Sequence, residues 1–587
     1  KVINSLQGQR FMKWSYGNFK FSRPIRWIVS LYNREILNFS LNGIEPKVLV
    51  SNKTYGNRLN SKNIEITNPL HYFTLLEQNG ILADREKRKN KILDQINTAA
   101  KKLELYPDLD ENLLNELTDL VENPNVILGD FDKEYLNLPA ELLCTVMKNH
   151  QRYIPLLKQN AYMSKLRITS EDILSTKFLL ISNGLKESDE IILEGNEKVI
   201  KARFADAGFF LEADKNTLCE KRVKKTEDVN YIKGLGNINQ RVKRIEHIAL
   251  RMFNTLEDPN LDIEKISDSA KYCKNDLCSE IVYEFPELQG IMGGKYLKNE
   301  GFSEEVSLAV AEHYLPRFYK DILPSTKYGA ILSVSDKLET IISIFVIGKR
   351  PSGSSDPFAL RRNLNGLIQI IWHYDFNIRL DSFIDYLLTY WVESIENLKF
   401  DKTKVFVELI EFTKQRILSH LDEIGLKKDL IDALCNSENI PSERILDILD
   451  LKKRTSTLER LKLNNKFEEI RNVISRVVKL ANNGDLPIDI LTSKGFVNTG
   501  LFEKESEENI FKFVLRLEEL IKTKNWDYQQ LIELFEQNLL LVEKILDNQD
   551  GVLIMSDDID LKNNRINLLS LIRNYSLLIA DFTLLNS

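Results

Sequence analysis

Hydrophobic residues recur at helical spacing through most of this chain, so the pattern predicts a predominantly α-helical protein. The signal is strongest from Val242 to about Trp391, where apolar positions three and four residues apart follow one another. One stripe in this part consists of Ile331, Val334, Leu338, Ile341 and Phe345. Further amphipathic helices are predicted to about Leu480, and again after a brief non-helical stretch from Leu491 to Leu501.

The first part of the chain has a different pattern. Short β-rich runs at residues 26–32, 35–41 and 48–50 are separated by Asn and Gly, which predicts strands and turns. Residues 119–225 mix helix and strand patterns. The predicted fold class is therefore multidomain and predominantly α-helical, with an α+β N-terminal part. The predicted segments are a β-rich part at 1–60, a mixed α/β domain at 61–225, a helical domain at 226–395, a helical linker domain at 396–485 and a helical bundle at 486–587.

A loop rich in Gly, Ser and basic residues leads into a helix after Gly348. Asp356 is placed to cap this helix, and Pro357 suits its first position because the missing N–H costs nothing there. The basic residues that flank this helix start are Lys349, Arg350, Arg361 and Arg362. A helix start of this kind can meet an anion, and an ordinary capped helix is the alternative.

Basic and aromatic residues are interleaved between Glu194 and Lys215. Lys198, Lys201 and Arg203 lie on a predicted helix beside Phe204, Phe209 and Phe210. Charge and stacking together can hold a nucleic acid, although phenylalanines at this spacing are also typical of a core. A second basic helix face carries Arg85, Arg88 and Lys91; it is expected to be solvated, with an RNA-backbone contact as the alternative.

The composition is that of a globular protein with no global basic field. The 587 residues carry a net charge of −6, so any RNA contact must come from local basic faces. The five cysteines are scattered, which favours a reduced, cytoplasmic compartment over a disulfide framework: Cys144, Cys219, Cys273, Cys278 and Cys435. No apolar run is long enough to span a membrane, and no signal peptide is recognised.

The helical domain resembles an HD-type domain, which in phosphohydrolases holds a metal. The corresponding residues here are His247, Asp276 and Asp336, but Asn275 stands where the His of the His-Asp pair is needed. We therefore predict a degenerate, metal-free fold, with a metal-dependent phosphohydrolase as the alternative. His313 is expected to be a packed histidine rather than a ligand.

No segment offers the chemistry of an adenylating enzyme. Gly234-Leu235-Gly236 followed by arginines superficially resembles the third class II synthetase motif, but Asn237 or Asn239 fits a helix cap better. The other class II motifs and the class I signatures are absent, and so is a Gly-rich phosphate cradle. The residues alone therefore indicate a large helical binding protein, and we predict no catalytic residue.

Several long strings resemble the β subunit of bacterial glycyl-tRNA synthetase of the α2β2 type. The first is SSDPFALRRNLNGLIQII, from Ser354 to Ile371. Others follow the family's order at Glu194–Lys215, Glu284–Tyr296, Ala311–Pro316 and Ser335–Gly348. With FSRPIRWIVSL and VLIMSDDIDLKNNRINLLSLIRN, the resemblance covers nearly the whole chain. The family's Gly-His-Arg-Phe string reads Gly-Asn-Arg-Leu at residues 56–59, which puts a role of the histidine in doubt.

The resemblance implies the following function. The chain would bind tRNA(Gly) and support ATP-dependent glycylation on an α subunit within an α2β2 heterotetramer, with ATP and Mg²⁺ used by the complex and no cofactor bound by this chain. Family members carry a further N-terminal segment, so this chain is expected to be truncated. A helical scaffold without an RNA role remains an alternative.

The last helices resemble the anticodon-binding bundle shared with arginyl-tRNA synthetase. Lys562, Arg565 and Arg573 fall off the apolar stripe and are candidates for tRNA contact. The structural alternative for Arg565 is an ion pair with Asp557, Asp558 or Asp560.

Overall fold

The computed structural model describes the chain except residues 1, 7, 9, 15, 42, 45, 46, 60–62, 160–165, 396, 397, 525, 548–551 and 587. The residues form two compact units. The first contains Lys1–Leu218 and Ser279–Lys295, and the second Cys219–Cys278 and Tyr296–Ser587. The protein is multidomain and predominantly helical, as the sequence predicts. The five-segment division remains a prediction.

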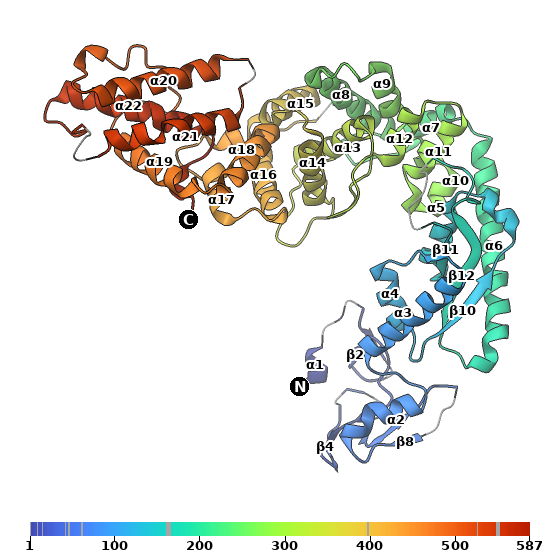
Figure 1. Cartoon of the computed structure of the whole chain (residues 1–587). Coiled ribbons are helices and arrows are strands. Elements are labelled where there is room, and N and C mark those ends of the chain that lie inside the picture. The colour runs from blue at the N-terminus through green and yellow to red at the C-terminus, as the bar shows by residue number, and fades with distance from the viewer. Residues whose placement is uncertain are drawn as a thin grey trace. The chain divides into compact units, whose positions relative to one another are not determined.

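The first strands of the chain are short and pair locally (Figure 1). Antiparallel pairs join β1 (Met12–Lys13) to β2 (Lys20–Phe21), β4 (Leu31–Tyr32) to β5 (Glu35–Ile36), and β7 (Lys53–Tyr55) to β8 (Asn63–Glu65). β3 (Ile28–Val29) and β6 (Val50–Ser51) run parallel. The β-rich runs therefore do form strands, although each is only two or three residues long.

A four-stranded antiparallel sheet follows, in the order β10 (Asn125–Asp130), β12 (Leu174–Ser182), β11 (Ile154–Leu157) and β9 (Tyr106–Pro107). The buried side chains of Ile92, Ile96, Leu117 and Leu179 join the sheet to α3 (Arg85–Lys102) and α4 (Glu111–Leu120). The 27-residue helix α6 (Asp189–Lys215) packs along β10 (Figure 1).

The basic face of α3 is less open to solvent than predicted, because its side chains bond to α4 and the segment after it. Arg85 pairs with Asp119 at 2.8 Å, and Arg88 donates to the carbonyl oxygens of Thr118 and Leu82. Lys91 donates to Asn123 Oδ1 at 2.6 Å. These side chains dock α3 against α4 and the segment after it, so the expectation of a freely solvated face is wrong for Arg88 and Lys91, while an RNA-backbone contact stays an untested prediction.

In the second unit, α13 (Lys327–Val346) is the central helix of the region predicted to be helical from Val242 to Trp391. Nearly all of its residues are buried, because other helices pack around it. These helices are α8 (Ile238–Leu256), α9 (Ile263–Tyr272), α12 (Glu304–Glu312), α14 (Leu360–Tyr374) and α16 (Lys402–Glu423). α15 (Leu380–Ser394) reaches α13 through Trp391, whose Nε1 donates to Ser343 Oγ. Asp336 and Glu339 of α13 are buried as well, which requires charged or hydrogen-bonding partners.

A succession of helices, most of them at least 15 residues long, completes the chain (Figure 1). They are α16 (Lys402–Glu423), α17 (Lys428–Cys435), α18 (Ile448–Lys462), α19 (Phe467–Ala481), α20 (Glu505–Lys522), α21 (Tyr528–Ile545) and α22 (Ile559–Leu577). The remaining helices, all earlier in the chain and each at most nine residues long, are α1 (Val2–Ser5), α2 (Tyr72–Gln78), α5 (Ala140–Thr145), α7 (Cys219–Lys225), α10 (Glu280–Glu284) and α11 (Ile291–Asn299). Among the described helices, none has both the length and the apolar character that crossing a membrane requires.

Candidate nucleic-acid interface

The helix that follows the Gly- and Ser-rich loop starts later than predicted. α14 begins at Leu360 rather than at Pro357, and Ala359 before it adopts a left-handed conformation with φ of 53°. Asp356 still caps this helix, because its two carboxylate oxygens accept hydrogen bonds from the Leu360 and Arg361 N–H groups at 2.8 and 2.9 Å. The aspartate bridges an intervening turn, so the capping residue was predicted correctly and the first helical residue was not.

The basic residues around this turn differ in whether their charged groups are free to contact a ligand. Arg350 is committed to the fold, since its guanidinium donates to Glu408 and to the Phe345 carbonyl oxygen. Lys349 is exposed, with its ammonium 4.9 Å from the centre of the Phe358 ring. Arg361 is half-buried and Arg362 exposed, and neither they nor Lys349 pair with a described carboxylate. Three of these four cations can therefore face a ligand.

The interleaved basic and aromatic residues of α6 separate into two groups. Phe204 is buried and packs edge-on against Phe131 at 5.0 Å, as a core residue does. Phe209 is 72% exposed. Lys198 and Lys201 are exposed but pair with Glu194 at 2.6 Å and Asp132 at 3.0 Å. Arg203 is also exposed, and no described carboxylate pairs with it. This helix thus presents cations beside one exposed ring.

The candidate tRNA-contacting residues of α22 are mostly buried. Arg565 is buried, and its guanidinium pairs with Glu507 at 2.9 Å and Glu503 at 2.7 Å. Burial opposes its charge, but the hydrogen bonds to Glu507 and Glu503 outweigh burial and raise the pKa of Arg565. Arg565 therefore forms an ion pair within the chain, as the alternative to tRNA contact supposed, but its partners are Glu507 and Glu503 rather than Asp557, Asp558 or Asp560.

Arg573 is also buried, and it donates to the carbonyl oxygens of Leu486 at 2.6 Å and Ala481 at 3.4 Å. Burial lowers the pKa of Arg573. Lys562 is half-buried and has no described carboxylate partner. Only Lys562 of this C-terminal group is placed to reach a ligand at the surface.

The residues that correspond to HD-type metal ligands have other partners. The His247 ring stacks on Tyr390 of α15 with 3.6 Å between ring centres, and the Tyr386 hydroxyl lies 3.1 Å from His247 Nε2. Asp276 is fully buried in a 3-10 turn. In the described part of the chain, no group of three or more His, Cys, Asp or Glu side chains is arranged to hold a metal ion.

Asp336, the third of these residues, forms ion pairs with two cations of the chain. Its carboxylate lies 2.9 Å from Arg241 Nη2 and 3.0 Å from Lys274 Nζ. The Lys274 ammonium is fully buried and also lies 2.8 Å from His313 Nε2. Burial and the Lys274 charge both lower the pKa of His313, so that the imidazole is neutral. A divalent cation at Asp336 would have to face two positive charges already in place.

The Gly-Leu-Gly segment forms a helix cap. Gly234 and Gly236 have φ angles of 90° and 81°, which favour glycine, and Asn237 forms a capping box with Gln240 at the start of α8. The cap interpretation is thus confirmed, at Asn237. The cavity beside it has a volume of about 550 Å³. Its lining includes Lys243 and Arg244.

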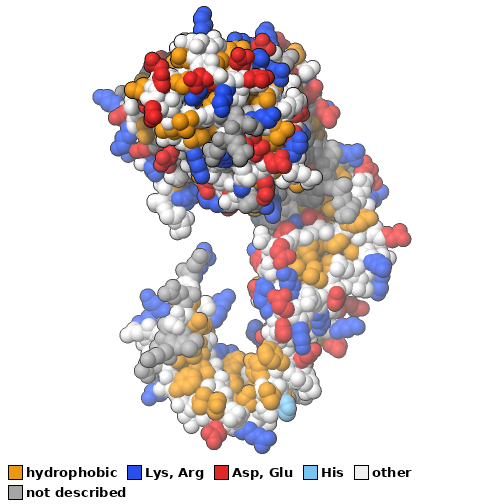
Figure 2. All heavy atoms as spheres, turned by 60° about the vertical axis from the view of Figure 1, so that its left-hand side comes forward, with side chains coloured by type: hydrophobic (Ala, Val, Ile, Leu, Met, Phe, Trp, Pro, Cys, Tyr) orange, Lys and Arg blue, Asp and Glu red, His pale blue; other side chains and the backbone are white. Residues whose placement is uncertain are grey.

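Sequence reasoning proposed no binding residue in the first 60 residues, although the structure displays basic and aromatic groups there. Figure 2 shows hydrophobic side chains at the bottom of the view, over the N-terminal strands and α2, bordered by Lys and Arg. Two cavities lie in this part, lined among others by Trp14, Arg26 and Trp27. A charge count by segment would have found the basic excess, which the net charge of the whole chain conceals.

Comparison with known proteins gives a consistent result. Residues 1–436 match the family described as "Glycyl-tRNA synthetase beta subunit". The glycine–tRNA ligase beta subunit of Trichodesmium erythraeum is 38% identical over 99% of this chain and 80% of the relative. Those of Thermodesulfovibrio yellowstonii and Clostridioides difficile are 36% and 34% identical over the same shares. The chain therefore belongs to the glycyl-tRNA synthetase β-subunit family.

Proposed function

We propose that this chain is the tRNA-binding β subunit of a glycine–tRNA ligase, and that the aminoacylation site lies on a separate α subunit in an α2β2 heterotetramer. The observation that carries the proposal is family membership over 99% of the chain. The exposed cations without a described carboxylate partner support it, because RNA phosphates are their natural counter-ions.

The chemistry of the described residues supports placing catalysis elsewhere. Adenylation needs preorganised donors around a triphosphate and its leaving pyrophosphate. The glycine-rich segment at residues 234–236 is instead part of a helix cap, and the buried Arg241 and Arg244 are neutralised by Asp336 and Glu339. ATP and Mg²⁺ would then serve the complex through the α subunit rather than bind this chain.

The proposed tRNA-contacting cations are those of the sequence-predicted candidates that the fold leaves at its surface. They are Lys198, Lys201, Arg203, Lys349, Arg361, Arg362 and Lys562. Lys198 and Lys201 would exchange a carboxylate partner for a phosphate, which costs little because surface ion pairs are weak. Arg350, Arg565 and Arg573 are excluded from the set because their side chains already have internal partners. The HD-like and anticodon-binding-like assignments of the two helical parts belong to the same proposal.

Reconstitution tests this function directly. The chain is mixed with a family α subunit, and glycylation of tRNA(Gly) is compared with that of the α subunit alone. A large gain on adding this chain is expected, together with tRNA binding that falls steeply with salt. No gain in glycylation, with both subunits folded, would refute the assignment.

Two alternatives have distinct outcomes. A metal-dependent HD-type phosphohydrolase predicts stoichiometric metal that is lost on Asp336→Ala, and the two cations on that carboxylate argue against it. A helical scaffold without an RNA role predicts no tRNA binding even at low salt. All five cysteines are free thiols, which supports a reduced compartment such as the cytoplasm.

A further inference from the structure

The first 60 residues are strongly basic within an acidic chain. They contain ten Lys and Arg but only two Glu, whereas residues 61–587 carry 70 Lys and Arg and 84 Asp and Glu. No described Lys or Arg among residues 1–60 forms an ion pair with a described carboxylate. This local positive charge is therefore not compensated within the described structure, and it attracts polyanions.

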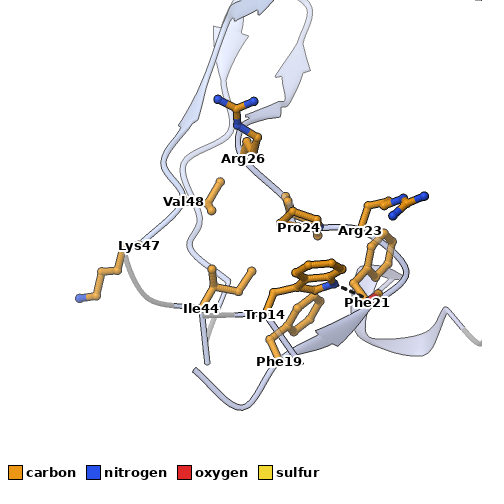
Figure 3. A pocket seen from close by; sticks show the side chains of 10 residues that line it. Trp14, Phe19, Phe21, Arg23, Pro24, Arg26, Ile44, Lys47 and Val48 are labelled. Carbon is orange, nitrogen blue, oxygen red and sulfur yellow. Dashed lines mark hydrogen bonds between the residues drawn. The ribbon is translucent and has the colours of Figure 1, made fainter. Parts of the chain in front are cut away.

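One cavity of about 330 Å³ lies among the first strands. Figure 3 shows the rings of Trp14, Phe19 and Phe21 gathered together, while the charged ends of Arg23 and Lys47 extend outward around them. Trp14 is held by a hydrogen bond from its Nε1 to the Phe21 carbonyl oxygen at 2.9 Å. All three rings are half-buried, so each is fixed by packing yet keeps part of its surface open.

A second cavity, of about 380 Å³, has the same kind of lining. Trp27 and Tyr55 meet edge-on at 4.8 Å, and Trp27 Nε1 donates to Thr54 Oγ1 at 3.2 Å. Arg58 also lines this cavity, and Arg26 lines both cavities. Glu122 is the one carboxylate among the residues that line either cavity in the described structure.

We propose that these two cavities hold neighbouring unpaired nucleotides of an RNA. Aromatic rings stack on bases without regard to sequence, and surrounding Arg and Lys neutralise the phosphates between them. A paired helix buries its base faces in its own stack, so an open aromatic cavity suits single-stranded nucleotides. Because both cavities share Arg26, one guanidinium is placed to contact the phosphate that links two bound nucleotides.

This inference rests on the proposed function and specifies the form of RNA that the N-terminal part takes. The 3′ end and the anticodon loop are the two places where a tRNA presents several consecutive unpaired nucleotides at its surface, and the chemistry of the cavities suits both. The experiment therefore needs separate arms for these two sources.

The test uses the full chain and three variants. Phe19→Leu removes a stacking ring but keeps an apolar side chain, and the double variant Arg23→Ala with Lys47→Ala removes two exposed cations at the rim. Arg34→Ala is the matched control, because Arg34 is an exposed cation of the β4–β5 turn that lines neither cavity. Circular dichroism and thermal melting establish that each variant folds.

The probes are a single-stranded oligoribonucleotide carrying 2-aminopurine and the same strand in a duplex. The wild-type chain should bind the single strand more tightly and change the fluorescence of the stacked base. Phe19→Leu should weaken single-strand binding about tenfold. The double variant should reduce the slope of log affinity against log salt by about 0.7 per cation removed. Equal binding of strand and duplex, or variants that match Arg34→Ala, would overturn the inference.

Trimmed tRNAs identify the source of the nucleotides. Two modified forms of tRNA(Gly) are compared: one lacks the unpaired 3′ nucleotides, and the other has its anticodon loop paired with a complementary strand. For the form that has lost the bound nucleotides, the wild-type chain and Phe19→Leu should have the same affinity. A Phe19→Leu variant that binds intact tRNA like the wild-type chain overturns the inference while leaving the proposed function intact. A wild-type chain that binds no tRNA at all overturns both.

Discussion

Replacing Asp336 by Ala should destabilise the helices around α13 by about 3–5 kcal/mol. The carboxylate is buried between Arg241 at 2.9 Å and Lys274 at 3.0 Å. Arg241 would keep Glu339 as a partner, but Lys274 would be left fully buried with only the neutral His313 imidazole and the Tyr314 ring beside it. The destabilisation arises from this uncompensated charge, because a buried ammonium without a counter-ion loses its hydration and gains no ion pair in its place.

The effect is best measured locally, because a chain with two compact units need not unfold in one step. Amide hydrogen exchange of peptides from α8 and α13 reports the free energy of opening these helices. The expected destabilisation lowers their protection by a factor on the order of 10²–10⁴. Asp385→Ala is the control: its exposed pair with Lys402 should contribute less than about 1 kcal/mol. A loss of protection no larger than that of the control would refute the reasoning.

The same carboxylate also predicts a dependence on pH. Burial opposes ionisation of Asp336, but Lys274 and Arg241 outweigh it and hold its pKa well below the usual value. A lowered carboxyl pKa stabilises the fold above the unfolded pKa of about 3.9, and this stabilisation is lost as the pH falls below that value. The stability difference between the wild-type chain and Asp336→Asn should therefore be constant near neutrality and shrink below about pH 4. A difference that grows on acidification would contradict this assignment.

Four further predictions follow from individual side chains. Asp356→Ala should cost about 1 kcal/mol by removing the cap of α14, measured by hydrogen exchange of its first turn. Arg565→Leu should destabilise the C-terminal helices by about 3–5 kcal/mol by leaving Glu507 buried and unpaired, without changing the salt slope of tRNA binding. Lys349→Ala with Arg362→Ala should reduce that slope by about 0.9 for each phosphate that is no longer neutralised, with folding intact. Burial lowers the pKa of Lys337 to about 7, so stability should rise from about pH 7 to pH 10, and Lys337→Met should abolish this rise in thermal melting.

Periodicity predicted the helices well because it depends on neighbours within one element. α13 and α6 form where apolar residues recur at helical spacing, and the β-rich runs of the first 60 residues form strands. The start of α14 was predicted three residues early, since sequence alone does not show that Asp356 spans a turn to reach Leu360 and Arg361. Local pattern thus identifies a capping residue more reliably than the position it caps.

Partners distant in sequence could not be predicted by the same means. Arg565 was expected to pair with nearby aspartates, but packing of α20 against α22 brings Glu507 to it from 58 residues away. Arg85, Arg88 and Lys91 share a helix face, and only the position of α4 and the segment after it shows that these side chains have partners within the chain. A charge pattern therefore indicates where cations lie on an element, and tertiary packing decides which of them a ligand can reach.

The distribution of charge bears on how an acidic chain can hold RNA. Screening at physiological salt confines electrostatic attraction to about 8 Å, so the net charge of −6 has little influence on a phosphate at a basic surface. What matters is whether the cations near that phosphate are already neutralised. Arg85, Arg565 and Arg573 already have partners within the chain, whereas the described cations of residues 1–60 have no described carboxylate partner. The acidic remainder would then oppose non-specific binding elsewhere and favour the N-terminal part as the place where RNA first contacts the chain.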